Sequence, residues 1–544
     1  MSSDNKRVKG SSLVTIRGLK IEGYSDDKWH PIIKGMDLDL KRGEVLGLIG
    51  ESGAGKSTLG LAAMGYTKPG CRISAGSIKF DGTELVNAPQ EDLRKMWGSK
   101  ISYVAQSAAA SFNPAHRLME QVVESATNHQ VMERGTAETD AKDLFKRLQL
   151  PNPDTIGTRY PHQVSGGQLQ RAMTAMAMSC RPDLIVFDEP TTALDVTTQV
   201  EVLASMRRIV EEFNTAAIYI THDLAVVAQM AHRIMVLRYG NLVEQADTRV
   251  MLKAPTQDYT KSLWAVRSLE KPEEKGSETA LSISNVDASY SGVAKVLDNV
   301  TVRLPRGKTV AVVGESGSGK STLARAITGL LPPSKGRIEF NGKALPAKLQ
   351  DRDRDTLRRI QMIYQSADTA LNPRQKVRDI IGRPLEFYLG LTGTAKENKI
   401  IALLNNIELG EDFIDRFPGE MSGGQKQRIS IARALAAEPD IIICDEVTSA
   451  LDQIVQEDIL KLLMKLQKET NVSYLFITHD IATVRAISDE IVVMYKGKVV
   501  QQGLKSEVLN PPYPAYTQLL LSSVPQMDPD WLTGLLKQRS GAQA

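Results

Sequence analysis

Cysteines, aromatic residues and long apolar runs are all scarce in this chain of 544 residues. Cys71, Cys180 and Cys444 stand more than a hundred residues apart, so no Cys-x-x-Cys pair could hold zinc or an iron–sulfur cluster. This cysteine usage fits a reducing cytoplasm best. The longest apolar stretches, such as VLGLI at 45–49, are far shorter than the roughly 18–20 residues that cross a bilayer. Any membrane role would therefore have to come through a partner.

An excess of charge of one sign is also absent. The chain has 67 Lys and Arg against 64 Asp and Glu, a net charge of +3. This is too small for the basic surface that coats phosphates, and nucleic acid is not expected as a partner. The amino terminus, MSSDNKRVKGSS, lacks the apolar core of a secretory signal, which predicts that the protein is not exported.

An internal repeat is the strongest feature that the chain does contain. GESGAGKSTL at 50–59 returns as GESGSGKSTL at 314–323, and Lys320 follows Lys56 by 320 − 56 = 264 residues. Three further strings recur at a common offset, since 422 − 165, 445 − 188 and 479 − 222 all equal 257. These strings are VSGGQ at 164–168 with MSGGQ at 421–425, FDEPTTALD at 187–195 with CDEVTSALD at 444–452, and ITHD at 220–223 and 477–480.

The repeat predicts two homologous domains in tandem, at 1–266 and 280–530. Between them, residues 267–279 hold seven charged residues in thirteen, which predicts a solvated linker. Residues 531–544 are expected to form a polar tail.

In each half, short apolar strands alternate with helices, which predicts an α/β fold with a mostly parallel, buried sheet. Functional groups are then expected at the carboxyl ends of the strands. Residues 107–180 and 366–437 are expected to form an inserted helical subdomain. The expected strands lie at 44–50, 183–189 and 216–223 in the first half, and at 308–314, 440–446 and 473–480 in the second.

Both copies of the first string fit G-x-x-x-x-G-K-[ST] between a strand and a helix, the pattern of a P-loop. Glycines are needed there because backbone N–H groups must turn inward around a phosphate. The lysine adds a positive charge, and the following serine offers a hydroxyl to Mg²⁺. A random Gly-rich turn is the alternative. The candidate ATP-binding residues are Gly50, Ser52, Gly53, Gly55, Lys56, Ser57 and Thr58, then Gly314, Ser316, Gly317, Gly319, Lys320, Ser321 and Thr322.

Two acidic residues end each of the apolar strands at 183–189 and 440–446. Asp188 and Asp445 are candidate Mg²⁺ ligands, and Glu189 and Glu446 are placed to orient or deprotonate an attacking water. Alternatively, such an acidic strand end pairs with a nearby lysine or caps a helix.

VSGGQLQR at 164–171 and MSGGQKQR at 421–428 resemble the signature of ATP-binding-cassette ATPases, and the resemblance covers nearly the whole chain twice. It implies two P-loop ATPase domains, each with an additional antiparallel β part. It also implies that each ATP is held head to tail between the P-loop of one half and the signature of the other, and that both sites hydrolyse ATP. The residues implied are Gln106 and Gln365 as Q-loop contacts to Mg²⁺ and the γ-phosphate, Asp195 and Asp452 in the D-loops, His222 and His479 as switch histidines, and Ser165, Gly166, Gly167, Gln168, Ser422, Gly423, Gly424 and Gln425 in the signatures.

Tyr24 and Tyr290 precede their P-loops by 50 − 24 = 26 and 314 − 290 = 24 residues. The family places an aromatic residue there to stack on adenine, although Trp29 is a second candidate in the first half.

The flanking strings narrow the resemblance to the ATP-binding subunits of bacterial dipeptide, oligopeptide and nickel importers. They are SFNP at 111–114, ALNP at 370–373, YPHQVSGGQ at 160–168, PTQDYTKSLW at 255–264 and PPYPAYTQLLLSSVP at 511–525. The last two could instead be amphipathic helices that cap each domain. Gly419 stands where this subgroup usually has His, and Leu169 stands where it commonly has a polar or basic residue. Many members also carry a cysteine cluster near the carboxyl end, but no cysteine follows Cys444 here, so no iron–sulfur cluster is expected.

The expected function is to energise solute import, with ATP and Mg²⁺ bound, at the cytoplasmic face of the cell membrane. The expected partners are two integral-membrane permease subunits, docked around Gln106 and Gln365, and indirectly an exported solute-binding protein. An exporter would use the same ATPase core. A soluble tandem ATPase acting on ribosomes is a further alternative, which the short linker disfavours, and a DNA-repair ATPase would need zinc clusters or coiled coils.

Overall fold

The computed structural model describes residues 10–25, 27–192, 194–265, 269–290, 294–449 and 451–541. The start of the amino terminus, residues 267 and 268 of the linker, and residues 542–544 of the tail lie outside this description. The chain forms two compact units: Met1–Trp264 with Pro525–Ala544, and Ala265–Val524. No helix in the described ranges is long and apolar enough to cross a membrane.

The first unit contains two sheets. The antiparallel sheet has the order β2-β1-β4-β5, and the larger sheet has the order β10-β9-β3-β8-β7-β6. In the larger sheet, β3, β6, β7, β8 and β9 run parallel and β10 is antiparallel to β9. The bounds are β1 (Ser12–Ser25), β2 (Lys28–Lys41), β3 (Val45–Ile49), β4 (Cys71–Phe80), β5 (Thr83–Glu84), β6 (Ile101–Val104), β7 (Leu184–Asp188), β8 (Ala216–Ile220), β9 (Arg233–Arg238) and β10 (Asn241–Asp247).

Two apolar cores cover the two faces of the larger sheet. Leu46 on β3 packs with Ile16 and Leu59 in the core that α1 shares with both sheets. Val45, the neighbour of Leu46, packs in the other core with α4 to α8, because successive side chains of a strand point to opposite faces. The helices are α1 (Lys56–Ala62), α2 (Gln90–Met96), α3 (Ala108–Ser111), α4 (Leu118–Asn128), α5 (Arg134–Arg147), α6 (Gly166–Met178), α7 (Val196–Glu212), α8 (Leu224–Met230), α9 (Thr248–Lys253) and α10 (Asp258–Ala265).

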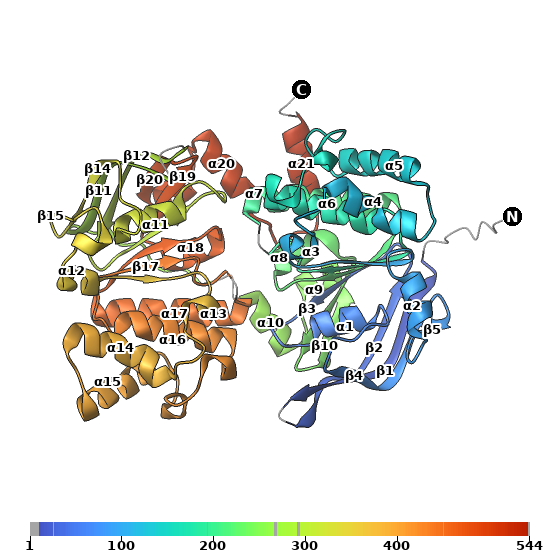
Figure 1. Ribbon diagram of the computed structural model, residues 1–544, viewed down its shortest axis with the longest axis horizontal. Helices are drawn as coiled ribbons and strands as arrows, with labels where there is room; N and C mark the ends of the chain where they lie inside the picture. The colour runs from blue at the N-terminus through green and yellow to red at the C-terminus, as the bar shows by residue number, and fades with distance from the viewer. Residues whose placement is uncertain are drawn as a thin grey trace. The chain divides into compact units, whose positions relative to one another are not determined.

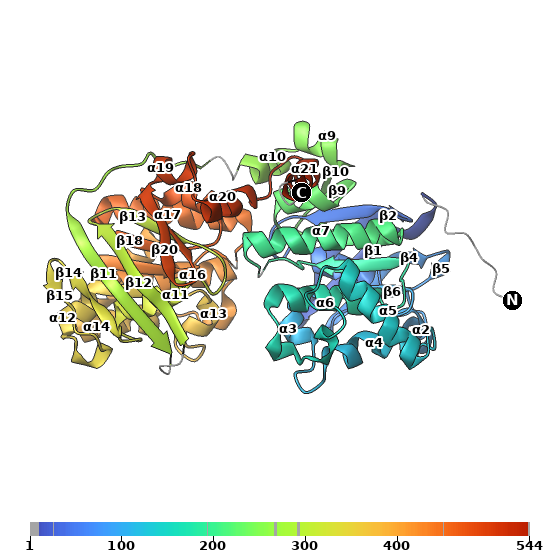
Figure 2. The ribbon, with the colours of Figure 1, turned by 90° about the horizontal axis from the view of Figure 1, so that it is seen from above.

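The second unit repeats this plan, with sheet orders β12-β11-β14-β15 and β16-β17-β18-β13-β19-β20 (Figure 2). The helical segments expected at 107–180 and 366–437 are present in their respective units. The strands are β11 (Thr279–Tyr290), β12 (Ala294–Pro305), β13 (Thr309–Val313), β14 (Lys335–Phe340), β15 (Lys343–Ala344), β16 (Ile360–Ile363), β17 (Ile441–Asp445), β18 (Ser473–Ile477), β19 (Glu490–Tyr495) and β20 (Lys498–Leu504). The helices are α11 (Lys320–Thr328), α12 (Arg354–Arg359), α13 (Ala367–Ala370), α14 (Val377–Leu389), α15 (Gly393–Asn406), α16 (Gly423–Leu435), α17 (Gln453–Thr470), α18 (Ile481–Ile487), α19 (Lys505–Leu509) and α20 (Ala515–Ser522).

The end of the chain corrects two sequence-based expectations. Residues 531–541 are not a polar tail but helix α21 (Trp531–Gly541), which packs on the first unit (Figure 1). Leu532 and Leu535 are buried in the core shared with α4 to α8, at 0% and 7% exposure. Gln229 fixes the approach to α21, since its Nε2 donates to the carbonyls of Gln526 (2.8 Å) and Asp528 (2.9 Å). The second domain therefore ends before Pro525.

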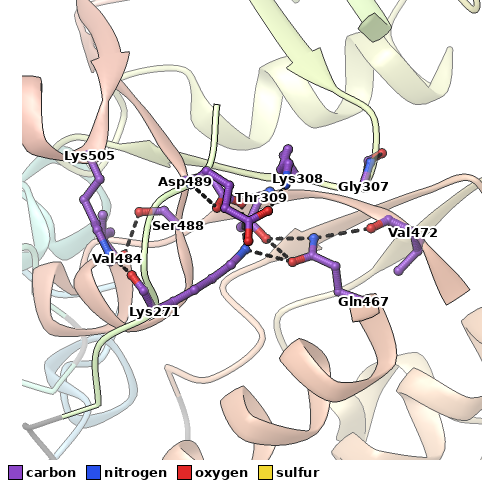
Figure 3. Close-up of polar contacts among 12 residues, drawn as sticks. Lys271, Gly307, Lys308, Thr309, Gln467, Val472, Val484, Ser488, Asp489 and Lys505 are labelled. Atoms are coloured by element: carbon purple, nitrogen blue, oxygen red, sulfur yellow. Dashed lines mark hydrogen bonds and ion pairs between the residues drawn. The ribbon is translucent and has the colours of Figure 1, made fainter. Parts of the chain in front are cut away.

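The linker also differs from expectation, because it is anchored to the second unit. Lys271 donates to the fully buried carboxylate of Asp489 (Nζ–Oδ2 2.7 Å) and to Oε1 of Gln467 (2.9 Å). The same Asp489 oxygen accepts the backbone N–H of Thr309 (2.8 Å), and Gln467 donates to the Thr309 hydroxyl (3.0 Å). Figure 3 shows these side chains converging on the start of β13. A linker cation thus neutralises a buried acid.

Replacing Lys271 with Met should strongly destabilise the second unit, because the Asp489 carboxylate would stay buried without its cation. A broken buried ion pair typically costs about 3–5 kcal/mol of unfolding free energy. Lys271→Met with Asp489→Asn should recover much of this loss. The measurement is urea unfolding, with Arg134→Met as control, since Arg134 pairs with Glu138 on the surface. Equal stability of Lys271→Met and Arg134→Met would contradict the prediction.

Candidate functional site

The P-loops adopt a backbone that only glycine tolerates at key positions. Gly50 has φ 147°, and a Cβ there would lie 2.1 Å from the carbonyl oxygen of Leu237. Gly53 has φ 80° and faces open space, since a Cβ there would have no atom within 4 Å. Gly314 and Gly317 repeat these features, with φ 150° and 79°. Each loop is therefore an open turn whose backbone can approach a ligand closely.

The amino group of each P-loop lysine donates to carbonyl oxygens of its own loop. Lys56 Nζ donates to the carbonyls of Gly50 (2.7 Å) and Glu51 (2.8 Å), and Lys320 makes the same two contacts at 2.8 Å each. Gly55 and Gly319 immediately precede α1 and α11. Ser57, Thr58, Ser321 and Thr322 lie in the first turns of these helices, and Ser52 and Ser316 lie in the loops. The cation, the hydroxyls and the helix amino terminus thus surround one cradle in each unit.

The serine after each lysine contacts the aspartate that ends the neighbouring strand. Ser57 Oγ donates to Asp188 Oδ1 (2.8 Å), and Ser321 Oγ donates to Asp445 Oδ1 (3.1 Å). A hydroxyl and a single carboxylate fit Mg²⁺, which takes oxygen ligands and is usually bound with substrate phosphates. Within the described part of the chain, no group of three or more His, Cys, Asp or Glu side chains could hold a metal.

The predicted glutamine, glutamate and histidine come together in each unit. Gln106 Nε2 donates to Glu189 Oε2 (3.1 Å), and His222 Nδ1 lies 3.4 Å from Glu189 Oε1. In the second unit, the contacts of Glu446 are 2.7 Å to Gln365 and 3.5 Å to His479. Both glutamates have a left-handed backbone, with φ 47° and 51°. Such strain in non-glycine residues concentrates at functional sites.

The electrostatics of these groups follow from their mutual contacts. Burial acts to raise the pKa of Glu189, but the hydrogen bond and charge of His222, together with Lys56, outweigh it and lower the pKa. His479 similarly lowers the pKa of Glu446 against burial. Burial acts to lower the pKa of each histidine, and its glutamate raises the pKa above the usual value. Each contact therefore favours the charged form of both groups, and the stabilisation that the histidine contributes is lost as the pH rises through its raised pKa.

The signature serines begin helices. Ser165 caps α6 by accepting the N–H of Gln168 (3.3 Å), and Gln168 Oε1 accepts the N–H of Ser165 (3.1 Å). Ser422 and Gln425 make the same reciprocal pair at the start of α16. A Cβ on the adjoining Gly166 or Gly423 would make only ordinary contact with Leu194 (3.8 Å) or Leu451 (4.0 Å), whereas Gly167 and Gly424 pack closely on Thr198 and Val455. Asp195 and Asp452 cap α7 and α17.

The aromatic candidates for adenine stacking are exposed. Tyr24 is 52% and Tyr290 41% exposed. Tyr24 lies beside Trp29, with ring centroids 5.2 Å apart, and Arg72 covers the Trp29 ring. Tyr290 accepts a hydrogen bond from Arg325 Nη1 of α11 (2.9 Å), which holds it near the P-loop helix.

Three tyrosines that the sequence did not single out as candidate site residues contact these sites. The N–H of Glu51 donates to the hydroxyl of Tyr259 (3.2 Å), and the N–H of Glu315 donates to the hydroxyl of Tyr516 (2.9 Å). The signal was present, since 516 − 259 = 257 is the offset of the repeat. The hydroxyl of Tyr103 donates to Asp188 Oδ2 (2.8 Å), and no repeated motif marks this residue. Helices α10 and α20 thus carry a tyrosine to each P-loop.

Comparison with known proteins assigns the family. The family model described as "ABC transporter" matches residues 33–192 and again 297–449. A glutathione import ATP-binding protein of Salmonella paratyphi A, GsiA, is 36% identical over 95% of this chain and 90% of its own length. The chain belongs to the ABC transporter family. This membership makes it an ABC ATPase that binds ATP.

Other known proteins and families also match this ABC ATPase, including its carboxyl end. The family model described as "Oligopeptide/dipeptide transporter, C-terminal region" matches residues 500–544. An uncharacterized ABC transporter ATP-binding protein of Escherichia coli K12, YejF, is 36% identical over 94% of this chain and 99% of its own length. A solved structure of an ATP-binding cassette shows a dimer in a post-hydrolysis state, bound to ADP and Pi. It is 32% identical to this chain, and the match covers 41% of this chain and 98% of the solved chain, with a TM-score of 0.37.

Replacing both Glu189 and Glu446 with Gln should preserve ATP binding while lowering turnover roughly 10²- to 10⁴-fold, the scale of a lost general base. The isosteric amide keeps the shape of the site but cannot accept a proton. Nucleotide binding and steady-state phosphate release are measured side by side, with Glu91→Gln as an exposed control. Near-native turnover of the double variant would show that the base is misassigned.

Tyr259→Phe and Tyr516→Phe should each weaken ATP binding roughly three- to tenfold at the P-loop that the tyrosine contacts. The loop amide loses its acceptor, and such a hydrogen bond is worth about 0.5–1.5 kcal/mol. Site-resolved ATP photolabelling measures the effect, and Tyr239→Phe, at an exposed tyrosine, is the control. Unchanged labelling in both variants would rule out this positioning role.

Proposed function

We propose that this ABC ATPase energises the import of peptide-like solutes, acting at the cytoplasmic face of the cell membrane on two integral-membrane permease subunits. An exported solute-binding protein would deliver the solute to those subunits. The observation that carries the proposal is the match of residues 500–544 to the oligopeptide/dipeptide transporter region. The naming of GsiA, which is similar over 90% of its own length, as a glutathione import protein supports it.

The site geometry supports the roles proposed for individual residues. The P-loop amides with Lys56 or Lys320 bind the ATP phosphates, and the Ser57–Asp188 and Ser321–Asp445 pairs hold Mg²⁺ together with the Q-loop glutamines. Bound Mg²⁺ would neutralise charge on the phosphates. Glu189 and Glu446 orient the attacking water and accept its proton, while His222 and His479 hold each glutamate ionised.

The sharing of each ATP between the P-loop of one unit and the signature of the other stays a prediction, based on the family resemblance. The uncrowded Gly166 and Gly423, each beside the amino terminus of a helix (α6 and α16), suit a phosphate. Stacking of adenine on Tyr24 and Tyr290 is likewise a prediction.

A groove beside Gln365 supports the docking of a membrane partner. It has a volume of about 760 Å³ and is bounded by α12, β16, α13 and α14. Tyr364 and Phe387 line it and are 46% and 42% exposed. Because Tyr364 directly precedes Gln365, a movement of the Q-loop would reach a segment docked in this groove.

The test is ATP-dependent uptake of labelled di- and oligopeptides in cells that carry the wild-type gene, its deletion or a groove variant. Deletion should abolish uptake of one solute class and leave translation unchanged. Phe387→Asp should lower uptake by at least about tenfold, because the exposed aromatic ring would be lost from the contact with the partner, and keep ATP binding. Val131→Asp, at an exposed apolar residue of the first unit, is the matched control.

Copurification of the chain with ribosomes and never with membranes would reject the proposal in favour of a tandem translation ATPase. ATP-driven efflux in place of uptake would indicate an exporter.

A further inference from the structure

The two candidate ATP sites differ at one position beside the aspartate that ends the strand. Tyr103 of β6 lies opposite Val186 of β7, and Met362 of β16 lies opposite Ile443 of β17. Val186 and Ile443 are equivalent, since 443 − 186 = 257, and each precedes its aspartate by two residues. Tyr103 and Met362 therefore occupy the same place in the two units.

This difference changes how each aspartate is held. In the first unit both carboxylate oxygens of Asp188 have a donor, because Ser57 contacts Oδ1 and Tyr103 contacts Oδ2, each at 2.8 Å. In the second unit Ser321 contacts Oδ1 of Asp445 at 3.1 Å. The thioether of Met362 has no proton to donate, and no second donor contacts Asp445 among the residues that the structure describes.

We propose that Tyr103 is a positioning residue for Mg²⁺ at the first site, so that the two ATP sites have different Mg²⁺ requirements. The inference rests on the proposed role of Asp188 and Asp445 as Mg²⁺ ligands. A carboxylate held at both oxygens is already oriented, with its Oδ1 and the Ser57 hydroxyl 2.8 Å apart. The Asp445 carboxylate must lose more freedom when the ion binds. Outer partners of metal ligands typically change metal affinity 10- to 100-fold.

The neutral phenol of Tyr103 donates to Oδ2 of Asp188, so it does not compete with Mg²⁺ for Oδ1. A hydrogen bond from a neutral donor removes only part of the carboxylate charge. The gain in orientation therefore outweighs the loss of charge, and the first site should fill with Mg²⁺ and ATP at the lower Mg²⁺ concentration.

The test is photolabelling of the full chain with 8-azido-ATP during a Mg²⁺ titration, followed by digestion and separate quantification of the peptides that contain Lys56 and Lys320. In the wild type, labelling at Lys56 should be half-maximal at roughly tenfold lower Mg²⁺ than labelling at Lys320. Tyr103→Phe should raise the requirement at Lys56 to that of Lys320 and leave Lys320 unchanged.

The reciprocal variant keeps the test decisive if Tyr103→Phe fails to fold. Met362→Tyr should lower the Mg²⁺ requirement at Lys320, and Met362→Leu, which adds no hydroxyl, should not. Because Met362 also lines the groove beside Gln365, the leucine variant controls for a change in that groove.

Equal Mg²⁺ requirements at the two wild-type sites would overturn the inference. Tyr103→Phe could instead lower ATP labelling by the same factor with Mg²⁺ as in EDTA. That result would also overturn the inference, because the loss of a residue with only a structural role would not depend on Mg²⁺. A chain that shows the expected Mg²⁺ difference but supports no solute uptake would instead reject the transport proposal alone.

Discussion

Both candidate ATP sites depend on the backbone turn that joins a buried parallel strand to a helix. β3 and β13 are buried along their whole lengths, and each continues into a glycine that packs against a carbonyl of the neighbouring strand. A side chain at either glycine would force the strand and its neighbour apart. The turn thus fixes where α1 and α11 begin, and so where their free N–H groups can meet phosphate.

Parallel pairing brings the remaining groups to the same edge of the sheet. Asp188 pairs with Ile220, so the end of β7 lies beside the segment that carries His222. The left-handed backbone of Glu189 then turns its side chain toward Gln106 and His222. The second unit repeats each step. The arrangement of these candidate catalytic groups is therefore a product of strand register, with the local strain at the glutamate offset by the contacts around it.

Much of this arrangement could be predicted from the sequence, because the motifs lie at the ends of short apolar strands and recur in the same order in both halves. The positions that escaped prediction depend on contacts between distant segments. In the sequence Lys271 is one charge in a polar linker, yet it pairs with the buried carboxylate of Asp489, more than two hundred residues away. Leu532, Leu535 and Leu536 follow helical spacing, but the core that covers Leu532 and Leu535 belongs to the first unit. The counterpart of Tyr103 in the second half is Met362, so the repeat could not reveal the tyrosine.

The central claim is that one chain carries two complete ATP sites, and native mass spectrometry of the intact protein with Mg²⁺ and ATP tests it most directly. The Glu189→Gln/Glu446→Gln variant, which should retain nucleotide, is predicted to show two ATP molecules per chain. Adding either Lys56→Ala or Lys320→Ala to it should leave one. A single ATP per chain before the lysine is replaced, or none, would contradict the account.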